Sequence, residues 1–213
     1  MKILVTAIKS REAYVKEMQK HIPNLEIIWD KHQDCMETFS RAWTSFGTES
    51  RIIFQDDVIL TKDFMSKAIK VINQHSDKVI TFFSLKGDDD KLGTRLMNGA
   101  GYCMNQCYYL PEGYGKAIHE YGKTWSRKAE HPTADDYLMA DFLKDNKLKY
   151  VIAVPSLVQH REVVSVIDSR RSKKRQSSTF SEPVEDLFEH YKKEDTMTIC
   201  QRLLTKIKTK LNK

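Results

Sequence analysis

The sequence predicts an α/β protein whose parallel sheet is covered by helices on both faces. Apolar runs of strand length alternate with segments in which apolar residues recur at helical spacing, and this alternation is typical of strand–helix–strand units. The chain has 213 residues, the size of one domain plus an extension. Its 40% hydrophobic and 10% aromatic content is enough to build a core, which argues against intrinsic disorder.

The first half of the chain predicts strands and helices in strict alternation. We expect strands at residues 2–8, 25–29, 51–55 and 78–85. The helices between them are indicated by three apolar stripes, which are Tyr14, Val15, Met18 and Ile22; Met36, Phe39, Trp43 and Phe46; and Phe64, Met65, Ala68, Ile69 and Ile72. Thr61 is the expected cap of the third helix.

The second half is less regular. Residues 99–110 carry glycines and then aromatic residues, a short helix is expected at residues 111–121, and another begins near Pro132. One more strand is expected at residues 150–154. Residues 169–179 read SRRSKKRQSST, a basic loop rich in hydroxyl groups, and two helical segments follow at residues 184–193 and 196–211. The sequence therefore predicts a basic, helical C-terminal extension.

Cysteine usage and hydropathy indicate a cytoplasmic protein. No apolar run approaches the roughly 18–20 residues that cross a bilayer, and the apolar start of the chain is too short for the core of a signal peptide. The four cysteines include no CxxC pair and are too few for a disulfide framework. We expect them to be reduced.

Two adjacent acids, Asp56 and Asp57, follow the third predicted strand. Ligands of open parallel sheets bind beyond the carboxyl ends of the strands. The two carboxylates lie between apolar runs, where their desolvation is costly unless a cation meets them, and a divalent metal is the natural partner. The alternative is that both acids are solvated turn residues that cap the next helix.

The missing motifs narrow the choice of ligand chemistry. The chain has neither GxxxxGK[ST] nor GxGxxG, so no glycine-rich loop would cradle a phosphate, and a metal would have to neutralise it. His160 follows the last predicted strand and offers an imidazole. Carboxylate, imidazole and phosphate oxygens together suit Mn²⁺ or Mg²⁺. The alternative is that His160 is structural.

Five segments occur in the order seen in the GT-A-type glycosyltransferases, namely FQDDVIL, NGAGYC, CYYLP, ADDYLMADFL and PSLVQH. The chain resembles a small, metal-dependent member of that superfamily, of phage or bacterial type, over residues 1–166. The resemblance implies a GT-A-like domain at residues 1–166, with a mixed, mostly parallel sheet, and leaves residues 167–213 as the extension. It also implies transfer of a sugar from a nucleotide-sugar donor, with a UDP-sugar favoured, to an acceptor hydroxyl.

The resemblance also implies roles for single residues. Asp57 and His160 would bind the metal, and Asp56 would lie near the ribose or the sugar, although Gln55 stands where many relatives carry an acid. The remaining donor-binding positions would be Thr6, Ala7, Ile8, Arg11, Asp30, Gly99, Ala100 and Gly101.

Asp135 and Asp136 match the acidic pair that supplies the general base in inverting relatives. A carboxylate within hydrogen-bond reach takes the proton of the acceptor hydroxyl as that hydroxyl attacks the sugar. The alternative is that both acids only complement the dipole of the helix that they begin, and a retaining reaction is then favoured.

The formal net charge is +6, and the excess of basic residues lies after His160. A run that could contact phosphates consists of Arg170, Arg171, Lys173, Lys174 and Arg175. Two acceptors fit such a run: hydroxymethylated bases of phage-type DNA, or a lipid-linked or cell-surface glycan on an anionic membrane. A solubilising surface loop is the third interpretation.

Two other classes of function remain open at this point. A nucleic-acid-binding module without catalysis would carry basic residues and stacking aromatics across its sheet, whereas here the charge gathers in the tail. A metal-dependent nucleotidyltransferase would use metal-bound acids in a similar fold, but it would cleave a nucleoside triphosphate without transferring a sugar.

Overall fold

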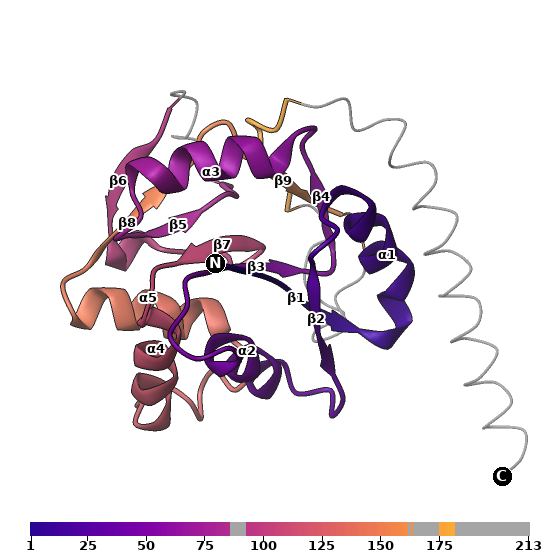
Figure 1. The fold of residues 1–213 in the computed structure, drawn as a ribbon. Helices are drawn as coiled ribbons and strands as arrows, with labels where there is room; N and C mark the ends of the chain where they lie inside the picture. Colours follow the sequence, from indigo (N-terminus) through magenta and orange to yellow (C-terminus); the bar gives the residue numbers. More distant parts are fainter. Residues whose placement is uncertain (86–92, 162, 164–174, 182–213) are drawn as a thin grey trace, which may run out of the picture. The chain divides into compact units, whose positions relative to one another are not determined.

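The computed structural model describes residues 1–85, 93–161, 163 and 175–181 (Figure 1). The chain divides into a compact unit at Met1–Phe180 and a second unit at Ser181–Lys213. Both helices expected in the extension lie outside the described residues, as do Arg170, Arg171, Lys173 and Lys174. The extension therefore stays a prediction.

The main sheet has seven strands in the order β2-β1-β3-β7-β5-β8-β6. Five of them run in one direction: β1 (Lys2–Ile8), β2 (Glu26–Asp30), β3 (Arg51–Gln55), β5 (Val79–Thr81) and β8 (Lys149–Ile152). The other two, β6 (Arg95–Asn98) and β7 (Cys107–Leu110), run antiparallel to their neighbours. The mixed, mostly parallel sheet is confirmed, whereas the wholly parallel sheet that the alternation alone indicates is wrong.

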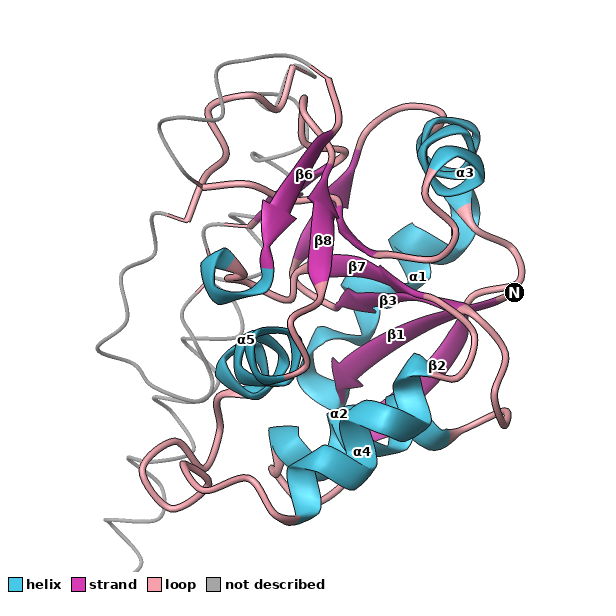
Figure 2. Ribbon diagram, turned by 90° about the vertical axis from the view of Figure 1, so that its left-hand side faces the viewer, coloured by secondary structure: helices cyan, strands magenta, loops and turns pink. Residues whose placement is uncertain are grey.

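Helices cover both faces of this sheet (Figures 1 and 2). One face carries α1 (Glu12–His21) and α3 (Phe64–Gln74), and the other carries α2 (Cys35–Thr44), α4 (Tyr114–Lys123) and α5 (Asp135–Asp145). Successive residues of a strand point to opposite faces, so Ile52 and Phe54 join one apolar core while Ile53 joins the other. Burial on both faces explains why the central strands read as unbroken apolar runs.

Two expected helix starts are corrected by the backbone. Thr61 does not cap α3, because Asp63 precedes the helix in a left-handed conformation (φ 58°), and Thr61 accepts the N–H of Phe64 only through its carbonyl. The helix expected from residue 111 begins at Tyr114, because Gly113 (φ 79°) interrupts the chain before it.

A buried arginine fixes the end of α2. Arg51 at the start of β3 is 1% exposed, and its guanidinium donates hydrogen bonds to backbone carbonyls. The acceptors are the carbonyl oxygens of Ala42, Trp43, Ser45, Gly47 and Glu49. Arg51 thereby holds the helix whose first turns border the pocket described below.

A separate two-stranded ribbon continues from β3. β4 (Val58–Leu60) pairs antiparallel with β9 (Val158–His160), and Val58 lies opposite His160 in the register. The N–H of Arg161 donates to the carbonyl of Asp57 at 2.8 Å, so the pairing reaches the acid that precedes β4. Neither strand was expected from the sequence. None of the described helices is long and apolar enough to cross a bilayer.

Candidate functional site

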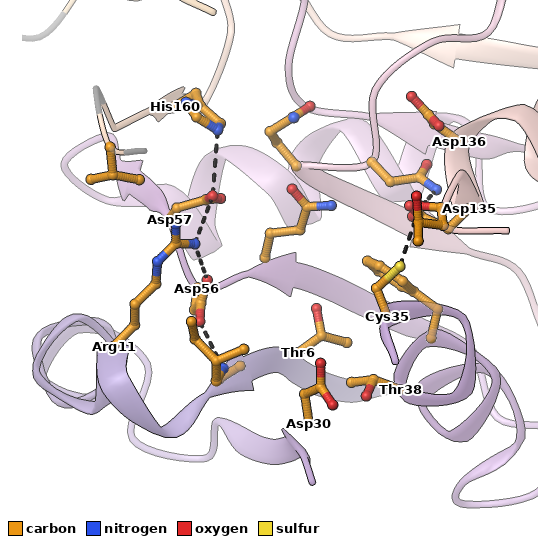
Figure 3. Close-up of a pocket in the computed structure, with 18 of the residues that line it drawn as sticks. Thr6, Arg11, Asp30, Cys35, Thr38, Asp56, Asp57, Asp135, Asp136 and His160 are labelled. Atoms are coloured by element: carbon orange, nitrogen blue, oxygen red, sulfur yellow. Dashed lines mark hydrogen bonds and ion pairs between the residues drawn. The ribbon is translucent and has the colours of Figure 1, made fainter. Parts of the chain in front are cut away.

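A pocket lies at the carboxyl ends of β1, β2 and β3, where an open sheet of this kind binds ligands. Its walls also include the segment before β7, the first turns of α2 and α5, and the end of β9 (Figure 3). Arg175 lines the pocket as well. The polar residues that line it are Thr6, Arg11, Asp30, Thr38, Gln55, Asp56, Asp57, Asn105, Gln106, Thr133, Asp135, Asp136, His160 and Arg175.

Asp56 is a buried acid that joins the ends of β1 and β3. Its Oδ2 accepts the N–H of Ile8 at 2.9 Å, and its Oδ1 accepts from Arg11 at 2.8 Å. Burial raises the pKa of Asp56 to about 6, while the positive charge of Arg11 opposes that rise. Both oxygens already accept hydrogen bonds from the protein, so the role of Asp56 in the pocket is to hold Ile8 and Arg11 in position.

Asp57 lies between Arg11 and His160. Its Oδ2 is 2.9 Å from Arg11 Nη1 and 3.4 Å from Nε2 of His160 (Figure 3). Burial favours a higher pKa for Asp57, but the charges of His160 and Arg11 hold that pKa well below its usual range. The Asp57 carboxylate is therefore ionised at neutral pH.

Arg11 forms ion pairs with both Asp56 and Asp57. Burial would lower its pKa, but the charges of Asp57 and Asp56 raise it, so the guanidinium stays positive. The arginine that the resemblance assigned to the donor thus contacts the acid pair directly, and one cation neutralises much of two negative charges.

The ends of β1 and β2 form the floor of the pocket. Thr6, Ala7, Ile8 and Asp30 all line it, as predicted for donor-binding positions. Asp30 is held in place because its Oδ1 accepts the N–H groups of His32 and Asp34, each at 3.1 Å.

The opposite wall carries the second acidic pair (Figure 3). Asp135 is 7% exposed, and its Oδ2 accepts a hydrogen bond from Asn105 Nδ2 at 2.6 Å. The Oδ1 of Asn105 in turn accepts from the Tyr102 hydroxyl at 2.6 Å. Burial, and then the charge of Asp136, raise the pKa of Asp135 to about 8, so it is mostly protonated at pH 7. Asp136 is partly exposed and lines the same pocket.

Asn105 and Gln106 are pocket residues that sequence reasoning missed. Gln106 is 2% exposed, and its Oε1 has no hydrogen-bond partner in the part of the chain that the structure describes. Both residues precede β7, which is antiparallel to β3, so its amino end meets the carboxyl end of β3. Recognition of β7 as an antiparallel strand would have placed them here.

Gly99, Ala100 and Gly101 are not among the pocket residues. They form a short 3₁₀ helix that packs against α5. A Cβ on Gly99 would stand 2.6 Å from Cβ of Leu143 and 2.8 Å from the carbonyl oxygen of Leu148, so helix packing requires glycine there. Their predicted donor contact gains no support from this geometry.

Asp57 and His160 are the residues that fit a divalent metal. Asp57 Oδ1 and His160 Nδ1 are buried and have no hydrogen-bond partner among the described residues, so neither atom is committed to another group there. Within the described residues, no group of three or more His, Cys, Asp or Glu gathers as a metal site. A metal held here would take its other ligands from phosphate oxygens and water, as Mg²⁺ commonly does.

The chain matches no protein-family model and no curated protein. Similar solved structures include a protein described as a glucose-1-phosphate thymidylyltransferase from Bacillus anthracis, in complex with sucrose (TM-score 0.45, 10% identity, 75% of this chain and 89% of that chain). They also include protein A197 from STIV (0.48, 13%, 83% and 92%) and a glycosyltransferase involved in glycosylation of the major capsid of PBCV-1 (0.29, 9%, 73% and 95%). These likenesses carry no argument about function, which has to come from the pocket.

Proposed function

We propose that this chain is a divalent-metal-dependent glycosyltransferase that moves a sugar from a nucleotide-sugar donor, with a UDP-sugar favoured, to an acceptor hydroxyl. One observation carries the proposal. A single pocket at the carboxyl ends of three parallel strands joins Asp57 and His160 on one wall with Asp135 and Asp136 on the other. This arrangement supports leaving-group stabilisation on one side and proton transfer on the other.

The nucleotide would lie along the ends of β1 and β2. The partly buried carboxylate of Asp30 has its Oδ1 fixed by two backbone N–H groups, which leaves Oδ2 to accept a hydrogen bond from a base or a ribose. Thr6 lies beside it, but its hydroxyl already donates to the carbonyl of Phe54 at 3.1 Å. We therefore expect Thr6 to contact the nucleotide by packing against it and not by donating a hydrogen bond.

The diphosphate would lie near Asp57 and His160, which would hold Mn²⁺ or Mg²⁺. Bound there, the metal would neutralise the charge that develops on the leaving diphosphate. Arg11 fixes the orientation of Asp57 through the 2.9 Å contact with Oδ2, while Oδ1 has no hydrogen-bond partner within residues 1–85, 93–161, 163 and 175–181. The chain thus presents one carboxylate oxygen and one imidazole nitrogen that are already ordered.

The proton of the acceptor would go to the acidic pair. Because the pKa of Asp135 is about 8, this carboxyl is mostly protonated at pH 7 and donates a hydrogen bond to a ligand hydroxyl. We therefore assign the general base of an inverting reaction to Asp136, which is partly exposed on the same wall. Asn105 keeps the carboxyl of Asp135 in a fixed orientation.

The acceptor follows from the basic run of the tail. Arg170, Arg171, Lys173 and Lys174 favour a polyanionic acceptor or a glycan displayed on an anionic membrane. Hydroxymethylated phage-type DNA and a lipid-linked glycan are the two acceptors to test, and a cytoplasmic enzyme reaches both.

Calorimetric titration of UDP and UDP-sugars, with and without Mn²⁺, tests the proposal. We expect Asp57→Asn to lose the metal-dependent part of donor affinity, and Asp63→Asn, an exposed acid before α3, to bind as the unaltered protein does. Donor affinity that is equal with and without metal, and unchanged in Asp57→Asn, would remove this pair from the site. Cleavage of a nucleoside triphosphate without sugar transfer would favour a nucleotidyltransferase, and salt-sensitive DNA binding without any donor binding would favour a binding module.

A further inference from the structure

A buried glutamine on β9 holds the segment of residues 175–181 in place. Gln159 is 4% exposed, and its Nε2 donates to the carbonyl of Ser177 at 3.1 Å while its Oε1 accepts the N–H of Ser177 at 2.8 Å. The side-chain amide thus satisfies both backbone groups of Ser177, as a neighbouring strand would. This pair of hydrogen bonds to the buried Gln159 side chain fixes the position of Ser177 beside β9.

Hydroxyl groups add a second fastening. Ser156, which is fully buried, shares a 2.7 Å hydrogen bond between its Oγ and that of Ser177, and its N–H donates to Oγ1 of Thr179 at 3.1 Å. The Oγ of Ser156 also accepts the N–H of Ser84 at 2.9 Å. The segment is therefore tied to the loop before β9 as well as to β9 itself.

This fastening sets the position of Arg175. Arg175 precedes Ser177 by two residues and lines the same pocket as Asp57 and His160, and His160 directly follows Gln159 on β9. The same strand thus orders one candidate metal ligand and the segment that carries the arginine. Arg175 was grouped with the acceptor-binding run by sequence, but its place is in the pocket.

The charges of the pocket leave a role for this arginine. Of the two arginines in the lining, Arg11 forms ion pairs with Asp56 and Asp57, whereas no ion pair joins Arg175 to another residue in the described part of the chain. The pocket also contains the carboxylates of Asp30 and Asp136. A phosphate entering this acidic pocket needs a cation, and a guanidinium binds phosphate oxygens through two parallel N–H bonds.

We propose that Arg175 binds the phosphate groups of the nucleotide in this pocket, so that it belongs to the donor site and not to an acceptor surface. The identity of the ligand as a nucleoside diphosphate rests on the function proposed above. The contact between Arg175 and phosphate needs only an anion in the pocket, so the two ideas can fail separately.

Calorimetry with uridine, UMP, UDP and inorganic pyrophosphate in the presence of Mn²⁺ tests the assignment. We expect Arg175→Gln to weaken UDP and pyrophosphate binding about 10- to 100-fold, the effect of losing a charged hydrogen bond, and to leave uridine affinity unchanged. Arg175→Lys should recover part of the loss, because a lysine keeps the charge without the paired N–H groups. Lys116→Gln, which removes an exposed charge on α4, is the matched control.

The salt dependence gives a second measurement. UDP affinity of the unaltered protein should fall more steeply with ionic strength than that of Arg175→Gln, whereas Lys116→Gln should keep the full slope. Equal UDP affinity and equal slope in Arg175→Gln and the unaltered protein would overturn the assignment while leaving the proposed function intact. If pyrophosphate binding depends on Arg175 but UDP gains nothing over pyrophosphate, the anion contact stands and the nucleotide function fails. Absence of binding to all four ligands would overturn both.

Discussion

Replacing Asp135 with Asn should stabilise the protein more and more as the pH rises. Burial and the charge of Asp136 raise the pKa of Asp135 from 3.8 to about 8, so the folded state holds a proton that the unfolded chain has released. The stability linked to this proton is fully present below about pH 4 and is lost as the pH rises towards 8. Each pH unit in that window costs about 1.4 kcal/mol, or about 6 kcal/mol over the whole window.

Asn keeps the hydrogen bond, because its carbonyl oxygen can accept from Asn105, and it has no proton to lose. Urea unfolding at pH 5, 6, 7 and 8, followed by tryptophan fluorescence, should therefore show the unfolding free energy of Asp135→Asn gaining on that of the unaltered protein by about 1.4 kcal/mol per pH unit. Asp63→Asn, at an exposed acid, is the control and should show no such trend. A difference between Asp135→Asn and the unaltered protein that does not change with pH would refute the buried, protonated carboxyl.

Three further substitutions test the packing that shapes the pocket. Arg51→Met should lower the unfolding free energy by about 3–5 kcal/mol in urea titrations, because it strips the donor from buried carbonyls at the end of α2, and a loss under 1 kcal/mol would show that water replaces it. Gly99→Ala should cost about 1–3 kcal/mol through the clash with Leu143 and leave UDP affinity unchanged; weaker UDP binding without a lower melting temperature would restore the glycine to the donor site. Trp43→Phe should cost about 1–3 kcal/mol, because it leaves the buried Tyr108 hydroxyl without its 2.9 Å partner, and equal melting temperatures would contradict this.

The two strands whose observed bounds the sequence patterns predicted lie in the interior of the sheet and are mostly buried. β1 was predicted with its observed bounds, and β3 likewise, because a parallel strand between two helical layers is apolar at nearly every position. β6 was missed because it is a four-residue strand at the edge of the sheet, where Leu96 is 52% exposed and no alternation develops. β7 was missed because its aromatic residues fit a buried strand and a buried helix equally well.

Some residues of the candidate site could be predicted from the sequence, and others could not. Asp56 and Asp57 could be predicted from their place at the end of a buried strand, and Thr6 and Asp30 from the resemblance to the GT-A-type enzymes; all four line the pocket. The partners of Asp135 could not, because the contact with Asn105 depends on the direction of β7. A side-chain contact between residues far apart in the sequence produces no periodic pattern of apolar residues, so the sequence alone does not reveal it.

The pairing of β4 with β9 leads us to expect that the pocket assembles late in folding. The strands of this ribbon come from segments far apart in the chain, since Val58 and Arg161 are 103 positions apart, and such non-local pairing closes slowly. The ribbon is a separate two-stranded sheet, although Val58 and Val158 also pack into the core on one face of the seven-stranded sheet, and we expect the ribbon to open before that sheet does. A ligand that requires both Asp57 and His160 would hold the ribbon shut, and amide hydrogen exchange in β4 and β9 would slow while exchange in β1 and β3 stays the same. Ligand affinity and the rate of amide exchange in β4 and β9 therefore both report on the equilibrium between the open and the closed ribbon.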